Sequence, residues 1–173
     1  VVGYARDPAK LRRAEELGVI DTGAPSLAEA VAGAEIVLVA TPVGAMERIF
    51  AQLAPLLPPT ALLTDVGSTK GSVITAARRA FGHLPTRFIP GHPIAGTERS
   101  GVEAAFATLY RERRVILTPL STNPPEAVAR IRWMWEQAGA VVETMAADHH
   151  DEVLAATSHL PHLLAFALVH TLA

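Results

Sequence analysis

Residues 88–98 contain a histidine placed for proton transfer. They read Phe-Ile-Pro-Gly-His-Pro-Ile-Ala-Gly-Thr-Glu, so His92 stands between a short apolar run and a turn rich in glycine and proline. Pro93 fixes its own φ and drives the preceding residue toward extended backbone, which holds His92 on a stiff segment. Imidazole titrates near neutral pH, and a histidine at the exit of a strand therefore suits a general base. The same spacing equally fits a surface histidine that caps a turn.

A second candidate segment is the loop Gly67-Ser68-Thr69-Lys70-Gly71, which follows an apolar run at residues 61–66. Its composition resembles a phosphate-binding loop, but it lacks the full P-loop spacing, so nucleotide hydrolysis is weakly supported. The alternative is a glycine-rich turn from strand to helix, in which a serine or threonine caps the helix.

The third candidate segment is Ser158-His159-Leu160-Pro161-His162 within a long apolar helix that we expect to begin near His149, with Asp148 as its N-cap. Residues three and four apart share a helix face, so one serine and two histidines can point the same way. Pro161 should bend the helix there. The histidines at 149, 150, 159 and 162 also suggest a metal site, but no cysteine supports it and we expect no metal.

The remaining pattern alternates short apolar runs with amphipathic segments. Expected strands cover residues 1–4, 35–40, 61–66, 87–89, 114–118 and 141–145, and expected helices cover 8–17, 27–32, 43–57, 72–81 and 124–138. Unbroken apolar runs such as residues 36–40 indicate strands buried on both faces. This alternation predicts a doubly wound α/β sheet, whose ligands bind beyond the carboxyl ends of the strands. Residues 41–42, 65–70 and 91–98 all fall at such ends.

Composition narrows the function further. The 173 residues carry a net charge of −2 and no cysteine, which argues against a nucleic-acid partner and excludes a disulfide framework. No uninterrupted apolar run approaches the about 18 residues of a membrane helix, so no membrane partner is expected. The chain begins within an expected strand and ends within a helical pattern. We therefore expect a fragment cut at both ends.

Three motifs in one order make the chain similar to the family of prephenate, arogenate and cyclohexadienyl dehydrogenases of tyrosine biosynthesis. They are residues 65–71, 91–98 and 158–162, and the resemblance covers essentially the whole chain. It implies a Rossmann-like, mostly parallel sheet followed by an all-α dimerisation domain. Residues 1–146 would be the dinucleotide-binding domain without its first strand, and residues 147–173 the start of the helical domain.

The resemblance implies NAD- or NADP-dependent oxidative decarboxylation in the cytoplasm by a homodimer. His92 matches the family's catalytic histidine, which forms a hydrogen bond with the substrate hydroxyl or takes its proton. Ser68 matches a serine that forms hydrogen bonds with both that histidine and the substrate hydroxyl. Glu98 matches an acid that gates the pocket. The residues that match the substrate pocket are Thr97, Glu98, Ser158, His159 and His162. Those that match the cofactor site are Ala5, Arg6, Thr41, Pro42 and Gly67.

Two departures from the family pattern bear on the ligands. NAD-using members carry an acid where this chain has Ala5, and the neighbouring Arg6 could pair with a 2′-phosphate, which leaves NADP open. The glycine-rich GxGxxG turn and the arginine for the substrate carboxylate are absent from these 173 residues.

Two alternatives remain. A β-hydroxyacid dehydrogenase on the same fold would need a lysine in the helical domain, and Lys70 is the last lysine of the chain. A non-catalytic dinucleotide sensor would have no need to gather Ser68, His92 and residues 158–162 at one crevice.

Overall fold

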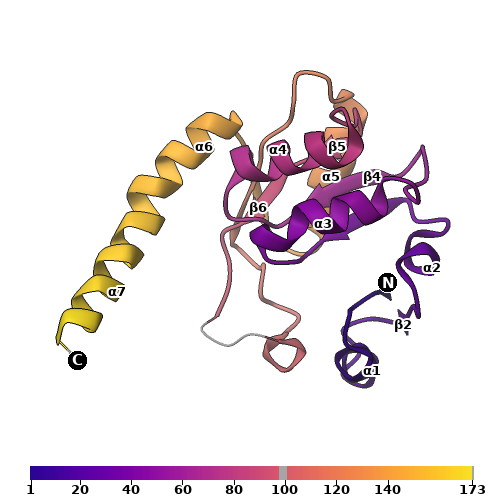
Figure 1. The fold of residues 1–173 in the computed structure, drawn as a ribbon, viewed down its shortest axis with the longest axis horizontal. Coiled ribbons are helices and arrows are strands. Elements are labelled where there is room, and N and C mark those ends of the chain that lie inside the picture. The colour runs from indigo at the N-terminus through magenta and orange to yellow at the C-terminus, as the bar shows by residue number, and fades with distance from the viewer. Residues whose placement is uncertain (98–100, 173) are drawn as a thin grey trace.

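The computed structural model describes residues 1–97 and 101–172, which form an α/β body and a long helical arm (Figure 1). The strands are β1 Val2–Gly3, β2 Thr22–Gly23, β3 Ile36–Val39, β4 Leu62–Asp65, β5 Phe88–Ile89, β6 Gly91–Pro93, β7 Arg114–Leu117 and β8 Val141–Thr144. The helices are α1 Pro8–Glu16, α2 Leu27–Val31, α3 Val43–Leu53, α4 Lys70–Phe81, α5 Pro125–Gln137, α6 Ala147–Leu154 and α7 Leu160–Leu172, with a 3₁₀ turn η1 at Val102–Ala104 and a π-helical segment η2 at Ala155–His159.

The strands pair mostly in parallel, as the alternating pattern predicts. β3, β4 and β5 form one parallel group, and β7 and β8 pair in parallel in another. Across Pro90 the chain continues from β5 into β6, which pairs antiparallel with β7 and sets His92 opposite Ile116. β1 and β2 form a separate parallel pair. The Rossmann-like α/β fold expected from the sequence is confirmed.

Two hydrophobic clusters lie on opposite faces of the central strands. Successive residues of β4 belong to different clusters: Leu63 packs with α3 and α4, whereas Leu62 packs with α5. Phe88 and Ile89 alternate in the same way. Alternation of this kind needs cover on both faces, which explains why these strands read as continuous apolar runs. The expectation that β3 is buried on both faces is wrong for Leu38, which is 43% exposed.

Local capping decides where several helices begin. Asp7 and Ser26 accept backbone hydrogen bonds from Ala9 and Glu29 and cap α1 and α2. The expected cap at Asp148 is wrong, because α6 begins one residue earlier at Ala147 and Asp148 lies in its first turn. Helix α4 starts at Lys70 rather than at residue 72, because another helix supplies its cap, as described below.

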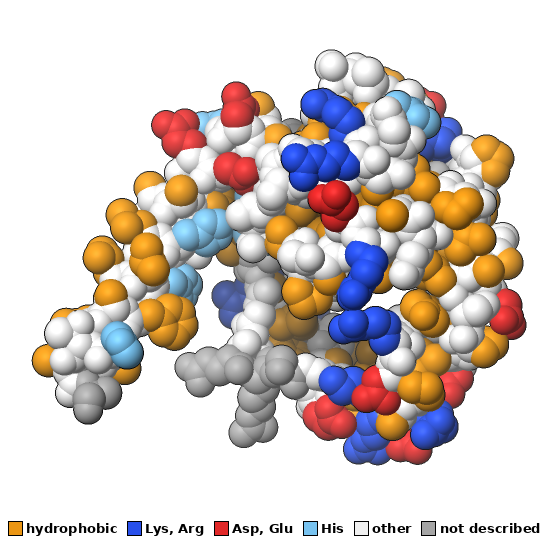
Figure 2. All heavy atoms as spheres, viewed as in Figure 1, with side chains coloured by type: hydrophobic (Ala, Val, Ile, Leu, Met, Phe, Trp, Pro, Cys, Tyr) orange, Lys and Arg blue, Asp and Glu red, His pale blue; other side chains and the backbone are white. Residues whose placement is uncertain are grey.

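The arm runs from Ala147 to Leu172 through α6, η2 and α7. Pro161 lacks a backbone N–H, and the π-helical segment ends two residues before it, at His159. Such segments accommodate a break in the α-helical hydrogen bonds. Figure 2 shows hydrophobic side chains over much of the arm and histidines along the side that faces the body.

The expectation about membrane spans needs correction at this arm. By length and composition alone the 26-residue helix, with a hydropathy of 1.4, is apolar enough to cross a membrane, as the core helix of a soluble protein also is. Counting uninterrupted apolar residues missed it, because serine, threonine and histidine break the run while residues 153–172 contain no Asp, Glu, Lys or Arg.

Candidate active site

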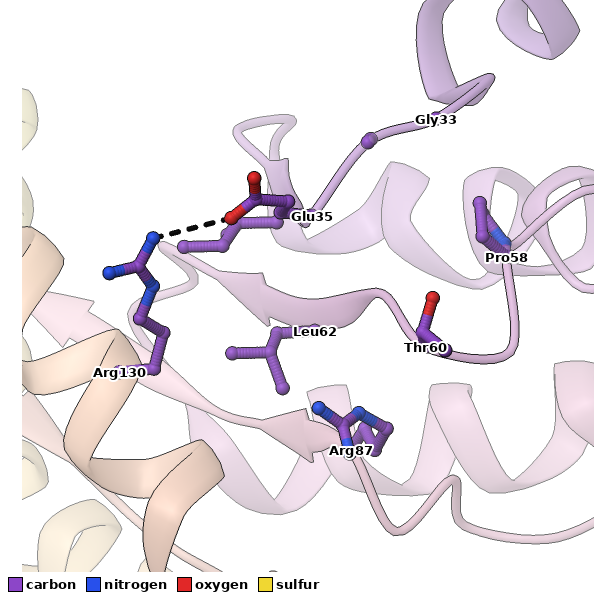
Figure 3. A pocket seen from close by; sticks show the side chains of 9 residues that line it. Gly33, Glu35, Pro58, Thr60, Leu62, Arg87 and Arg130 are labelled. Carbon is purple, nitrogen blue, oxygen red and sulfur yellow. Dashed lines mark hydrogen bonds and ion pairs between the residues drawn. The ribbon is translucent and has the colours of Figure 1, made fainter.

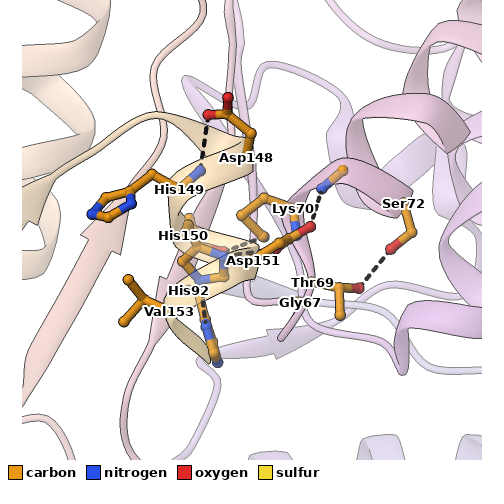
Figure 4. A network of polar contacts seen from close by, with 12 residues as sticks. Gly67, Thr69, Lys70, Ser72, His92, Asp148, His149, His150, Asp151 and Val153 are labelled. Atoms are coloured by element: carbon orange, nitrogen blue, oxygen red, sulfur yellow. Dashed lines mark hydrogen bonds and ion pairs between the residues drawn. The ribbon is translucent and has the colours of Figure 1, made fainter. Parts of the chain in front are cut away.

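His92 reaches from β6 toward the first helix of the arm. Its Nδ1 lies 2.9 Å from His150 Nε2, and the two rings meet edge to face with centroids 5.1 Å apart (Figure 4). His92 is half-buried, whereas His150 is fully buried. The strand that carries His92 is fixed by its pairing with β7, so the backbone from which the imidazole extends is rigid.

His150 leads directly to a carboxylate that joins two helices. His150 Nδ1 lies 2.8 Å from Asp151 Oδ1. The same carboxylate accepts the backbone N–H of Lys70 at 2.7 Å and that of Gly71 at 2.8 Å, which are the first two residues of α4. The first N–H groups of a helix have no intrahelical acceptor and favour an anion there. Asp151 thus caps α4 from α6, 80 residues away in the sequence.

A buried ion pair between Lys70 and Asp65 fixes the backbone next to the site. Lys70 Nζ donates to Asp65 Oδ2 at 2.5 Å and to the carbonyl oxygen of Gly91 at 2.6 Å. Asp65 also accepts the backbone N–H groups of Gly67 and Gly91. These bonds connect the end of β4, the following turn and the residue before His92. The loop at 67–71 is therefore a strand-to-helix turn whose lysine is fully buried, and the phosphate-loop interpretation is wrong for Lys70.

Burial and the neighbouring charges act on the titration of these groups. Burial raises the pKa of Asp65 and lowers that of Lys70, and their mutual attraction opposes both shifts. Burial also raises the pKa of Asp151, but the hydrogen bonds from Lys70, Gly71 and His150 outweigh it, and the net shift is downward. Asp151 is consequently ionised at neutral pH.

His92 is held neutral. Burial is the main cause that lowers the pKa of His92 to about 4; repulsion by His150, Lys70 and His159 in their protonated forms adds to it, while Asp151 opposes the shift. A histidine with such a pKa is unprotonated at physiological pH and can accept a proton. Its Nε2 makes no hydrogen bond with any described residue.

The other residues expected at the substrate pocket lie in different settings. Ser158 and His159 are half-buried on η2, while His162 is exposed and its Nδ1 contacts the carbonyl oxygen of Ser158 at 2.8 Å. Thr97 is exposed. Glu98 lies outside the described residues.

The expected hydrogen bond between Ser68 and His92 is not formed. Ser68 is exposed in the turn after Gly67, and His92 Nδ1 is already bonded to His150. Ser68 therefore remains a prediction only as a contact for the substrate hydroxyl.

The residues expected at the cofactor follow two strand ends and one turn. Ala5 and Arg6 follow β1, and exposed Arg6 has no ion-pair partner among the described residues. Thr41 follows β3, and its buried Oγ1 has no hydrogen-bond partner in the described part of the chain. Pro42 is exposed at the start of α3.

Gly67 completes this set, and here the neighbouring side chains leave no room for a Cβ. A Cβ at this position would lie 2.9 Å from both Asp65 Oδ2 and Val73 Cγ2. The buried oxygen of Thr41 and the unpaired cation of Arg6 fit a polar, anionic ligand at this edge of the sheet.

His150 is the functional residue that sequence reasoning missed. The pattern offered it only as one of several possible metal ligands, yet within the described residues no group of three or more His, Cys, Asp or Glu is arranged to hold a metal. Its contact with His92 spans 58 residues. Adjacency to an acid at a helix start was the only local signal.

A cavity of about 310 Å³ lies elsewhere, at the opposite edge of the sheet (Figure 3). Its lining includes Glu35, Leu62 and Arg87, which stand at the amino ends of β3, β4 and β5, and none of the expected site residues. Arg130 there pairs with Glu35 at 3.2 Å. The candidate site lies instead at the carboxyl edge, where His92, His150 and Asp151 are in contact.

Comparison with known proteins identifies the family of the chain. Residues 1–144 match the family model described as prephenate dehydrogenase, nucleotide-binding domain. The chain belongs to the prephenate dehydrogenase family. It is 42% identical over 158 residues to cyclohexadienyl dehydrogenase of Zymomonas mobilis, covering 91% of this chain and 53% of that protein. It is 38% identical over 173 residues to prephenate dehydrogenase of Bacillus subtilis, covering 98% and 46%.

A solved family structure has the same fold. Prephenate dehydrogenase from A. aeolicus, in complex with hydroxyphenyl propionate and NAD⁺, superposes with a TM-score of 0.89 at 39% identity, covering 98% of this chain and 59% of that one. The chain spans about half the length of the curated relatives that it matches. The family resemblance read from the three motifs is confirmed.

The low pKa of His92 predicts how it titrates and how stability responds to acid. Between pH 6.5 and about 4 the unfolded chain protonates this histidine while the folded chain does not, so the free energy of unfolding should fall as the pH falls through this range. NMR titration of the imidazole should give a midpoint near 4, and the His92→Asn variant should lose less stability over the same range. A midpoint at or above 6 would contradict the assigned environment.

Proposed function

We propose that the full-length protein catalyses the NAD(P)-dependent oxidative decarboxylation of prephenate or arogenate. Membership of the family supports this proposal, and the observation that carries it is the neutral His92 at the carboxyl edge of the sheet, with Nε2 unbonded among the described residues. The products are 4-hydroxyphenylpyruvate from prephenate or tyrosine from arogenate.

In this proposal His92 acts on the hydroxyl of the substrate ring. As the carbinol carbon gains carbonyl character, the hydroxyl proton moves toward Nε2. It returns to the oxygen when loss of CO₂ makes the ring aromatic. A positioned general base contributes about 10²–10⁴-fold to rate. Ser68 would contact the same hydroxyl, and Thr97, Glu98, Ser158, His159 and His162 would line the pocket.

A nicotinamide dinucleotide would supply the hydride acceptor. Thr41, Pro42 and Gly67 would pack against it. The Thr41 hydroxyl has no hydrogen-bond partner among the described residues, and position 67 has no room for a side chain. Ala5 and Arg6 would face the adenosine ribose. Without an acid at Ala5, the ribose hydroxyls lack an acceptor and Arg6 offers a cation for a 2′-phosphate. We propose that NADP is accepted as well as NAD.

The arm supports a proposal about assembly. Apolar side chains of α7 are largely exposed, with Leu163 65%, Phe166 73% and Leu172 78% accessible. We propose that residues 1–146 form the nucleotide-binding domain and 147–173 part of a helical domain through which two copies associate, in the cytoplasm. Burying apolar surface against a second copy would relieve this exposure.

The alternative enzyme is a β-hydroxyacid dehydrogenase. It would need a lysine in the helical domain, and residues 147–173 contain none. Lys70 belongs to α4 and is fully buried and bonded to Asp65 and Gly91. A dinucleotide sensor would bind the cofactor without consuming it. Assays of NADH or NADPH formation with prephenate, arogenate and a simple β-hydroxyacid separate these cases. Turnover of neither cyclic substrate would overturn the proposal.

His92→Asn should lower kcat with prephenate or arogenate by two decades or more, because the amide cannot accept the hydroxyl proton. Dinucleotide affinity measured by calorimetry should stay within about twofold, since His92 is not expected to contact the cofactor. His83→Asn, a histidine outside the site, serves as the matched control. A tenfold or smaller loss of turnover would remove His92 from the role of base.

Ala5→Asp should shift preference toward NAD by weakening NADP. A carboxylate there would accept the ribose hydroxyls and repel a 2′-phosphate. The measurement is the ratio of kcat/KM for the two cofactors, with Ala5→Asn as the uncharged control. If Asp and Asn leave the ratio unchanged, Ala5 does not face the ribose.

A further inference from the structure

We propose that His150 and Asp151 are positioning residues that fix the tautomer of His92 through a directed chain of hydrogen bonds. In this chain His92 donates from Nδ1 to His150 Nε2, and His150 donates from Nδ1 to Asp151 (Figure 4). Nε2 of His92 is then left as the basic nitrogen. The role of that nitrogen in turnover rests on the proposed function, but the direction of the chain does not.

The direction is set at Asp151. Its Oδ1 accepts the N–H of Lys70 and its Oδ2 the N–H of Gly71, and a backbone N–H can only donate. Both carboxylate oxygens are thus acceptors, and two backbone donors at a helix N-terminus keep the group ionised. The third partner, His150 Nδ1 at 2.8 Å from Oδ1, must therefore donate as well.

His150 passes this direction on to His92. A neutral imidazole has one N–H, and His150 uses it at Nδ1, so its Nε2 carries a lone pair. The ring nitrogen 2.9 Å away is His92 Nδ1, which must hold the proton between them. A doubly protonated His150 would reverse this last step, but it would bury a cation in a fully enclosed position.

The groups packed around the two rings favour the neutral chain. Lys70 from α4 places a positive charge near His92, a protonated His159 from η2 would add to it, and Asp151 is the neighbouring anion. Lys70 is itself held by Asp65. A second proton on His92 would be repelled by the positive charge nearby.

The consequence is that the nitrogen of His92 on the open side of the site, Nε2, is the unprotonated one. Without a fixed acceptor at Nδ1, a neutral histidine can carry its proton on either nitrogen, and the form protonated at Nε2 cannot take a proton from a hydroxyl there. An imidazole oriented by a third group is the arrangement that general-base histidines use in catalytic triads. Here a second histidine stands between the base and the carboxylate.

The direct test is long-range ¹H–¹⁵N NMR of the histidine rings at pH 7 in the uniformly ¹⁵N-labelled chain. Spectra of His92→Asn and His150→Gln assign the two rings. We expect Nδ1 protonated and Nε2 unprotonated in both. A proton on Nε2 of His92, or two protons on His150, would overturn the proposal. This readout needs no turnover, so it is independent of the proposed function.

A kinetic comparison tests the effect on turnover. In full-length protein, His150→Phe fills the space but offers no acceptor, and kcat should fall by about tenfold to a hundredfold with cofactor affinity unchanged. His150→Gln can accept from His92 and donate to Asp151, and should recover to within about threefold of the wild type. Equal losses in both variants would contradict the proposal, because a purely structural role would not distinguish them. Circular dichroism and thermal melting confirm that each variant folds, and the NMR result stands if Phe does not.

Discussion

The carboxylate of Asp151 is the contact on which the site depends. It satisfies the two N–H groups that begin α4 and holds His150 in place at the same time. Each task favours the ionised form, because a helix N-terminus carries partial positive charge and the imidazole donates to the same anion. One side chain therefore attaches the arm to the body and orders the ring that contacts His92.

The buried Lys70–Asp65 pair is the second constraint on the site, and it acts on the backbone beside His92. Removing two charges from water is unfavourable, and such pairs are often no more stabilising than apolar residues of the same size. Here Asp65 also accepts the backbone N–H groups of Gly67 and Gly91, and Lys70 donates to the carbonyl oxygen of Gly91. These bonds fix the turn after β4 and the path of the chain just before His92. Its contribution is therefore to geometry. Burial is the main cause that keeps the imidazole of His92 neutral, and the cation of this pair adds to it.

Local signals in the sequence were sufficient for most of the fold. Asp7 and Ser26 cap their helices, the apolar run at β4 is buried on both faces, and of the two tryptophans only Trp135 enters the core while Trp133 lies under Arg130. The motif around His92 predicted the candidate site at the carboxyl edge of the sheet. The role of Asp151 could not be read in this way, because an acid in a first turn looks like an ordinary response to the dipole of its own helix, whereas it caps a different one. Lys70 was likewise misjudged, since a lysine in a glycine-rich loop gives no sign that a buried aspartate five residues earlier will hold it.

Amide hydrogen exchange at the start of α4 tests most directly whether Asp151 joins the two helices. The amides of Lys70 and Gly71 have no intrahelical acceptor, so their protection should come from Asp151 alone. The Asp151→Ala variant should exchange these two amides at least tenfold faster and leave the amides of α3 unchanged. Asp148→Ala, one turn away on the same helix, is the control. Unchanged protection at Lys70 and Gly71 in the Asp151→Ala variant would contradict the account.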